Sequence, residues 1–127
     1  MLRAKELTLS HENLRDARKY RKGAWQRASN ILSCMTMMSG TTGTTYLVID
    51  SVGKAKKAFA SARQPYTEAD VLRVELPNTP GALARFVGKL AQEDINITLG
   101  YQTSTKGSRK VSVVLAVSDL AKANRIR

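Results

Sequence analysis

Residues 71–81 read Val-Leu-Arg-Val-Glu-Leu-Pro-Asn-Thr-Pro-Gly, and this stretch decides how the second half of the chain folds. Residues 71–76 alternate apolar and polar side chains, which is typical of a strand with one buried face. The prolines and the glycine that follow interrupt this strand. Thr79 suits the N-cap of a helix and Pro80 its first position, where the missing N–H costs nothing. The stretch therefore predicts a strand, a tight loop and the start of a helix.

The residues after Gly81 continue the pattern of a small α+β module. Apolar side chains recur at the spacing of an amphipathic helix, at Leu83, Phe86, Val87, Leu90 and Ala91. Residues 95–101 alternate as a second strand, residues 105–108 suit a hairpin loop, and residues 111–117 form a third strand. A second helix starts at Asp119, and we expect the last strand of the module to be missing. The order of elements predicts the split βαβ architecture.

The first half of the chain repeats part of this pattern. Residues 47–55 match the residues 68 positions later, and both stretches are a strand that runs into a helix. Asn30-Ile31 mirrors Asn96-Ile97, and Glu12-Asn13 falls where Pro77-Asn78 falls. We therefore expect an α+β fold of two ferredoxin-like βαββαβ modules with antiparallel sheets and helices on one face. The predicted modules are residues 1–68 and 69–127, and each is small for independent stability.

The loop and the strand after the first helix of the second module carry a family resemblance. The stretch Asn78-Thr79-Pro80-Gly81-Ala82-Leu83-Ala84, followed by Ile95-Asn96-Ile97, resembles the ACT domain. In that family Asn-x-Pro-Gly-x-Leu-Ala opens a helix and Asn-Ile opens the next strand. The resemblance covers residues 71–127 well and residues 1–70 in part. It implies a regulatory module that binds a small ligand, often an amino acid, and that works as a homodimer or docks on a metabolic enzyme.

The loop also suits an amino acid on chemical grounds. Gly81 lets a ligand approach the backbone, and the helix after it offers unpaired N–H groups and a positive dipole end to a carboxylate. Asn78 can both donate and accept hydrogen bonds. We therefore predict a ligand site formed by Asn78, Thr79, Pro80, Gly81, Ala82, Leu83, Asn96 and Ile97. In the alternative interpretation, Asn78 and Gly81 only build a turn and Asn96 only caps the end of a strand.

Resemblance to serine-sensing members of the family implies that Asn78 and Asn96 hold the ligand. Those members carry a histidine two positions before the first asparagine, where this chain has Leu76, so serine itself is in doubt. In the first copy a histidine and an asparagine do fit that pattern, and a further asparagine matches Asn96. The predicted site therefore also includes His11, Asn13 and Asn30.

The positive charge of the chain is concentrated in one segment. Lysine and arginine outnumber the acidic residues by 21 to 10, which gives a net charge of +11. Six of the cations are Arg15, Arg18, Lys19, Arg21, Lys22 and Arg27. As an alternative function, they would form a phosphate-binding face for nucleic acid, with Trp25 available to stack on bases. We favour a solvated face or residues without selected function, because no nucleic-acid-binding motif accompanies the charge.

The sequence predicts neither an enzyme nor a bound cofactor. Cys34 is the single cysteine, which we expect to be a buried thiol, and His11 is the single histidine. Neither a metal-ligand cluster nor a nucleophile with its base can be built from them. No apolar run reaches the roughly 20 residues of a membrane helix, and no apolar stretch follows the basic start of the chain. We therefore expect a cytoplasmic protein without a membrane partner.

Residues 14–29 lack the Pro-Gly loop and the helical spacing that the first copy should have, and we hypothesise a compensated frameshift. Codons permitted for residues 15–18 can read Gly-Thr-Leu-Ala in the next frame, and those for residues 21–26 can read Ala-Arg-Ala-Leu-Gly-Lys. We predict that the nucleotide sequence gives this loop and helix when codons 15–26 are read in the +1 frame. A +1 frame that does not resemble the ACT pattern would contradict the hypothesis.

Overall fold

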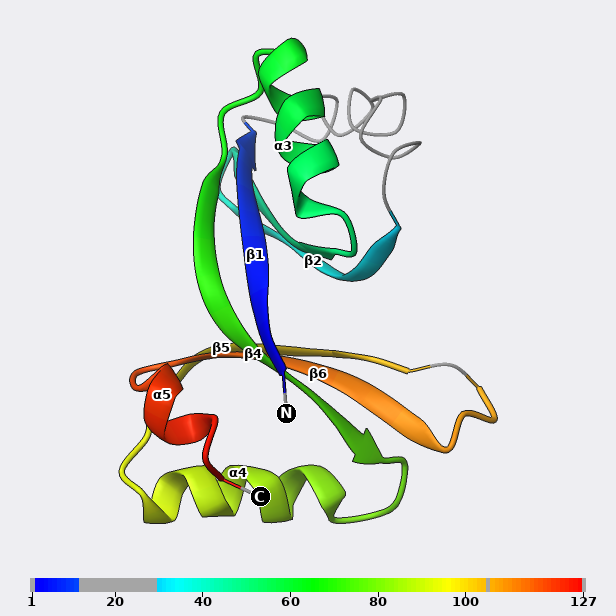
Figure 1. The fold of residues 1–127 in the computed structure, drawn as a ribbon, viewed down its shortest axis with the longest axis vertical. Helices are drawn as coiled ribbons and strands as arrows, with labels where there is room; N and C mark the ends of the chain where they lie inside the picture. Colours follow the sequence, from blue (N-terminus) through cyan, green and yellow to red (C-terminus); the bar gives the residue numbers. More distant parts are fainter. Residues whose placement is uncertain (1, 12–29, 105, 127) are drawn as a thin grey trace. The chain divides into compact units, whose positions relative to one another are not determined.

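The structure, a computed structural model, describes residues 2–11, 30–104 and 106–126 (Figure 1). The described elements are β1 (Leu2–His11), β2 (Ile31–Ser39), β3 (Thr42–Ile49), α3 (Val52–Ser61), β4 (Thr67–Pro77), α4 (Ala82–Gln92), β5 (Ile97–Thr103), β6 (Lys110–Val117) and α5 (Leu120–Ala123). β1 with β3, β2 with β3, β4 with β6, and β5 with β6 all pair antiparallel. The prediction of an α+β fold with antiparallel pairing is confirmed.

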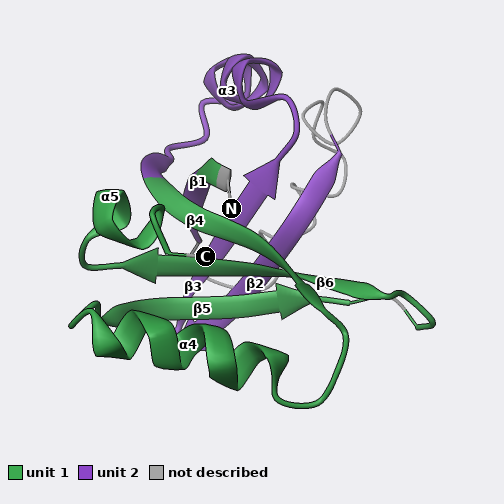
Figure 2. Ribbon diagram, turned by 60° about the horizontal axis from the view of Figure 1, so that its bottom comes forward, with its two compact units in different colours: residues 1–4, 70–127 green, residues 5–69 purple. Residues whose placement is uncertain are grey.

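Contacts divide the chain into two compact units (Figure 2). Unit 1 contains residues 1–4 and 70–127, and unit 2 contains residues 5–69. Both β1 and β4 therefore have residues in each unit. The sequence pattern predicts residues 1–4 as part of the first module, whereas in the structure they group with the second half of the chain.

Unit 1 is built around β6, which lies between β4 and β5 in the sheet. Residues 2–4 of β1 lie on the other side of β4, at the sheet position of a fourth strand. α4 and α5 pack on the same face of this sheet, because both contribute to one hydrophobic core. That core consists of Leu72, Val74, Phe86, Leu90, Ile95, Val111, Val113, Leu115 and Ala123. The strand members of the core come from alternate positions of β4 and β6, as the period of a half-buried strand requires.

α4 begins later than the sequence predicts. Its N-cap is Gly81, with a φ of 83°, so the prediction of Thr79 as N-cap is wrong. The Ala82 N–H donates to the Thr79 carbonyl at 3.3 Å and closes a turn before the helix. A residue at positive φ cannot continue a right-handed helix, and helical bonding starts with the Arg85 N–H and the Gly81 carbonyl at 2.9 Å. Pro80 therefore lies in the turn and not in the helix.

In unit 2, β3 lies between β1 and β2. α3 packs on this sheet through a core of Leu7, Leu9, Leu47, Ile49, Ala55 and Phe59. Tyr66 extends the core, with its ring centroid 5.4 Å from that of Phe59. Glu68, at the start of β4, pairs with Lys56 of α3, and this hydrogen bond raises the pKa of the Lys56 amino group. The start of β4 is thereby held against the helix of unit 2.

β2 leaves several apolar side chains accessible. Cys34 is exposed on this strand, so the prediction of a buried thiol is wrong. Met37 and Met38 are 52% and 40% exposed, and Ile31 is 40% exposed. β2 is the outermost strand of unit 2 in the described sheet order, and an edge strand has a neighbour on one side only. An apolar run on such a strand need not be buried, which the sequence pattern does not reveal.

A substitution of Leu90 tests the packing of α4, because the Leu90 side chain is 0% exposed in the core of unit 1. We expect Leu90→Ala to lower the free energy of unfolding by about 2–5 kcal/mol, since it removes buried methyl groups and leaves a cavity. Leu83→Ala is the matched control on the same helix, where the side chain is 40% exposed, and should cost about 1 kcal/mol or less. Urea denaturation followed by circular dichroism measures both, and equal losses would contradict this packing.

Candidate functional site

Asn78 connects the loop between β4 and α4 to the hairpin between β5 and β6 through two hydrogen bonds. Its backbone N–H donates to the Arg109 carbonyl at 2.8 Å. Its side-chain Nδ2 donates to the Ser108 carbonyl at 3.0 Å. Among the described residues nothing donates to Asn78 Oδ1, so this atom can accept a hydrogen bond from a ligand. Asn78 therefore builds the loop, as the alternative interpretation holds, and still has a free acceptor.

The first turn of α4 favours a negatively charged group. It contains no acidic residue and no side chain that caps it, and the helix has 11 residues. The first N–H groups of a helix lack intrahelical acceptors and carry a positive partial charge. The missing Cβ of Gly81 lets the Arg85 side chain lie against this end of the helix, because a Cβ there would be 2.9 Å from Arg85 Nη1. The Arg85 guanidinium therefore lies beside the turn and adds a full positive charge to it.

Asn96 lies at the opposite end of the same sheet from Asn78. In the two ladders of β6, Pro77 pairs with Lys110 and Ile97 pairs with Val117, which are the first and last residues of that strand. At about 3.3 Å per residue, β6 is about 23 Å long. The structure therefore brings residues 78–83 together in one loop and separates them from Asn96 and Ile97. A single small ligand cannot contact both asparagines of one unit.

Asn96 itself is held at a corner beside the start of α5. Its N–H donates to Ser118 Oγ, and its carbonyl accepts from the Ser118 N–H, both at 2.9 Å. Asn30 occupies a similar corner in unit 2, where its N–H donates to Asp50 Oδ1 at 2.9 Å and its carbonyl accepts from the Asp50 N–H at 3.1 Å. The pairing register also shifts just after each asparagine, between Ile31 and Ser33 and between Ile97 and Leu99.

Of the two remaining predicted site residues of the first copy, His11 and Asn13, the structure describes only His11. His11 is the last residue of β1, where it pairs with Gly43 of β3. Asn13 lies outside the described residues. The basic cluster at 15–27 also lies outside them, and so does the segment 14–29 of the frameshift hypothesis. The nucleic-acid alternative therefore stays a prediction.

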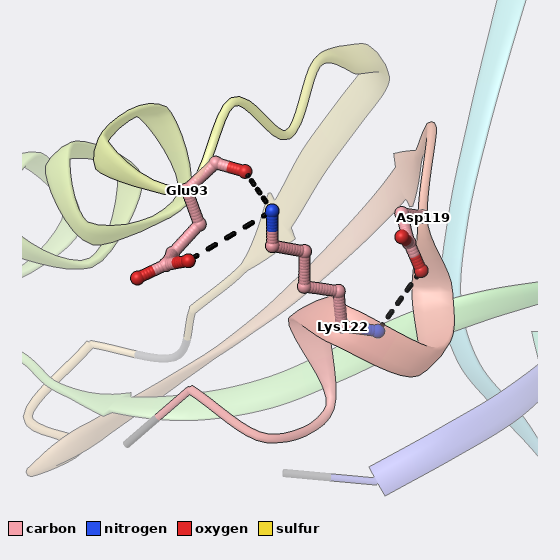
Figure 3. Close-up of polar contacts among 3 residues, drawn as sticks. All are labelled: Glu93, Asp119 and Lys122. Carbon is pink, nitrogen blue, oxygen red and sulfur yellow. Dashed lines mark hydrogen bonds and ion pairs between the residues drawn. The ribbon is translucent and has the colours of Figure 1, made fainter.

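Three residues fix the turn that leads from α4 to Asn96 (Figure 3). The Lys122 amino group donates to the Glu93 carbonyl at 2.7 Å and lies 3.8 Å from the Glu93 carboxylate. Asp119 caps α5 by accepting from the Lys122 N–H at 3.0 Å. A cation at the C-terminal end of α4 also complements the helix dipole. The sequence indicated the start of α5 at Asp119, but not the contact between Lys122 and Glu93.

Two open cavities lie beside the Asn78 loop. The first, of about 290 Å³, lies between β4 and α4 and is lined by Val74, Glu75, Leu76, Pro77, Ala82, Arg85, Phe86 and Lys89. The second, of about 450 Å³, lies on the hairpin side and is lined by Glu75, Thr103, Ser108, Arg109, Lys110, Val111 and Ser112. Sequence reasoning did not single out Glu75, Arg85 or Lys89. The only signal for the two cations is their spacing of four residues, which also fits an ordinary solvated helix face.

The described part of the chain contains no group of three or more His, Cys, Asp and Glu side chains that could hold a metal ion. Within those same residues, no helix has the length and apolar character needed to cross a membrane.

Comparisons with known proteins agree with the predicted family of the second half. Residues 71–126 match the family model of the ACT domain. The fold is similar to that of protein BT0572 from Bacteroides thetaiotaomicron, with a TM-score of 0.82 and 24% identity over 96% of this chain and 84% of that one. It is also similar to the ligand-free regulatory subunit of aspartate kinase from Thermus thermophilus, with a TM-score of 0.66 and 13% identity over 96% and 89%.

A third similar structure is the regulatory subunit of aspartate kinase from Thermus flavus, with a TM-score of 0.63 and 14% identity over 95% of this chain and 86% of that one. A search of curated protein sequences finds no match. At these identities the structures show the fold, and the family match confirms the ACT resemblance of residues 71–126.

The side-chain hydrogen bond of Asn78 makes a testable contribution to stability. We expect Asn78→Ala to lower the free energy of unfolding by about 1 kcal/mol, because it removes the Nδ2 donor from the Ser108 carbonyl. Thr79→Ala is the neighbouring control, since the exposed Thr79 side chain bonds to none of the described residues. Chemical denaturation without ligand measures both variants. A loss for Thr79→Ala as large as that for Asn78→Ala would contradict the role of Asn78 in holding the loop.

Proposed function

We propose, from the ACT domain at residues 71–126, that the chain is a non-catalytic regulatory protein that binds an amino acid or a similar small ligand. The observation that carries the proposal is the turn at Gly81, whose φ of 83° opens the uncapped end of α4 beside Asn78. The family match and the fold shared with regulatory subunits of aspartate kinase support a ligand-binding, regulatory role.

The loop suits both charged groups of an amino acid. The ligand carboxylate would lie against the first N–H groups of α4, where the helix dipole and the absence of acidic residues favour an anion. The ammonium group would donate to Asn78 Oδ1, which accepts no hydrogen bond from the described residues. Thr79, Pro80, Ala82 and Leu83 would contribute through their places in the same loop and first turn.

A role for Asn96 and Ile97 requires a second module. Because Asn78 and Asn96 lie at opposite ends of β6, a ligand that contacts both must lie between two modules. Such a ligand binds the associated form more tightly than the separate modules, so it shifts the equilibrium toward association. The second module would come from another copy of this chain in a homodimer, or from a metabolic enzyme on which the chain docks.

Unit 2 is, in this proposal, a second ferredoxin-like module of the same kind. Support comes from the corner at Asn30, which has the same pair of hydrogen bonds as the corner at Asn96 and the same register shift after it. Asn30 would then occupy the position that corresponds to Asn96. His11 and Asn13 keep their predicted place in a ligand site of this module.

Binding of amino acids tests the proposed function. We expect one or more amino acids at millimolar concentration to raise the melting temperature of the full chain in a thermal-shift screen. A ligand present at 100 times its dissociation constant stabilises the folded state by about 2.7 kcal/mol. Asn78→Ala should weaken binding by about tenfold, because the ligand loses a hydrogen bond to a charged group.

Lys54→Gln, an exposed change on α3 of unit 2, is the control and should leave the ligand-induced shift unchanged. Calorimetric titration with the amino acid that gives the largest thermal shift then measures its affinity directly, independently of the stability of each variant. If no amino acid stabilises the protein at millimolar concentration, the proposed function is wrong.

A further inference from the structure

We propose that the cavity between α4 and β5 holds the side chain of an aliphatic amino acid. This cavity has a volume of about 300 Å³ and is lined by Leu83, Val87, Gly100, Tyr101, Gln102, Val113 and Leu115. The charged groups of the ligand would bind as in the proposed function, on which this inference rests, and the cavity would select the side chain.

Apolar groups from one helix and two strands of unit 1 line the cavity. Leu83 and Val87 are four residues apart on α4, so their side chains lie on one flank of this helix. Val113 and Leu115 are alternate residues of β6 and belong to the core, so they lie on the face of the sheet that α4 covers. Gly100 pairs with Leu115 and therefore lies on the same face of β5.

The two helix residues of the lining take no part in the core of unit 1. That core uses Phe86 and Leu90 of α4, whereas Leu83 and Val87 belong neither to it nor to the partly buried side chains packed against it. Leu83 is 40% exposed. An aliphatic side chain that covers this flank would remove apolar surface of both molecules from water, which favours binding.

Gly100 keeps the strand side of the cavity open. A Cβ at this position would lie 2.9 Å from Leu115 Cδ2, so a side chain there would press on Leu115. The φ of Gly100 is not positive, so the backbone conformation does not require a glycine. The effect of this glycine is therefore the space that it leaves above the core face of β6.

The lining offers little to a polar or charged side chain. Of the described residues that form it, none carries a charge. Tyr101 pairs with Val114, and it alternates with Gly100, so its side chain lies on the face of the sheet away from α4. A charged side chain of a ligand would lose water in this cavity without gaining an ion pair, which disfavours binding.

Leu83 connects the cavity to the proposed binding loop. It is the second residue of α4, and among the described residues nothing accepts a hydrogen bond from the Leu83 and Ala84 N–H groups. In the proposed function these N–H groups face the ligand carboxylate. At 1.5 Å per residue, Leu83 and Val87 are about 6 Å apart along the helix axis, which is comparable to the length of a side chain of four carbon atoms.

A ligand series tests the inference on the full chain. Alanine, 2-aminobutyrate, norvaline and norleucine have the same charged groups and differ by one CH₂ group at each step. We expect the affinity to rise about fourfold per step, because each added CH₂ group is buried in an apolar site. In methyl NMR spectra, norleucine should shift the signals of Leu83, Val87 and Leu115 and leave that of Leu9, in the core of unit 2, unchanged.

Gly100→Val fills the cavity from the strand side. We expect it to weaken norleucine by about tenfold or more and to leave the affinity for alanine unchanged, since alanine does not reach the cavity. The same substitution at Gly88 of α4, where a Cβ would meet nothing within 4 Å, is the control and should change neither affinity.

Leu83→Ala is the second variant, because Gly100→Val presses on a core residue. It keeps the N–H group of position 83 and removes one wall of the cavity. It should weaken norleucine by at least about fourfold, the equivalent of one CH₂ group of contact, and leave alanine unchanged. Circular dichroism shows whether both variants keep the fold.

The outcomes separate this inference from the proposed function. Equal affinities along the series, or variants that weaken alanine and norleucine alike, would overturn the inference and leave the proposed function intact. A rising series that Asn78→Ala does not weaken would support the cavity and contradict the proposed role of Asn78.

Two further results would also overturn the inference. Methyl shifts of Leu83 and Val87 that follow the protein concentration, and not the ligand, would show that a second copy of the chain covers the cavity. Absence of binding by every member of the series at millimolar concentration would do the same, while binding of a polar amino acid in the thermal-shift screen would still support the proposed function.

Discussion

β6 pairs with β4 from Lys110 to Leu115 and with β5 from Ser112 to Val117, and the rest of unit 1 depends on this double pairing. Alternate residues of β6 enter the core that α4 and α5 cover. A slip of one residue in either ladder would turn these apolar side chains to the opposite face of the sheet. The burial of this core therefore fixes the register, and the register fixes where each loop of the unit begins.

The same register determines what a ligand can reach. It places Asn78 against Arg109 at one end of β6 and Asn96 against Ser118 at the other. Both positions are set by the ladders and not by flexible loops, so neither asparagine can move toward the other without breaking strand pairing. For the proposed function, a ligand that contacts both asparagines necessarily joins two modules. Under that proposal, regulation through association would follow from the length of β6.

The strands and the helix whose side chains follow a regular period could be predicted from the sequence. Features that depend on contacts between distant segments of the chain could not. Alternation located β4 and β6, and the helical spacing located α4, because each pattern reflects one buried face. Thr79 and Gly81 are both good residues before a helix, and the turn that the Thr79 carbonyl closes decides between them. No local pattern shows that residues 2–4 lie beside β4, or that β2 is an edge strand on which Cys34 is exposed. Arg85 belongs to a cavity only because β4 lies next to it.

The corners at Asn30 and Asn96 have the same hydrogen-bond geometry but different acceptor groups. In both, the asparagine N–H donates at 2.9 Å, but the acceptor is the Asp50 carboxylate in unit 2 and the Ser118 hydroxyl in unit 1. A carboxylate accepts more strongly and carries charge, so it attracts an ammonium group and repels a carboxylate, whereas a hydroxyl does neither. If each corner forms half of a ligand site, the corner in unit 2 favours the ammonium end of an amino acid. The two units would then offer unlike half-sites rather than two copies of one site.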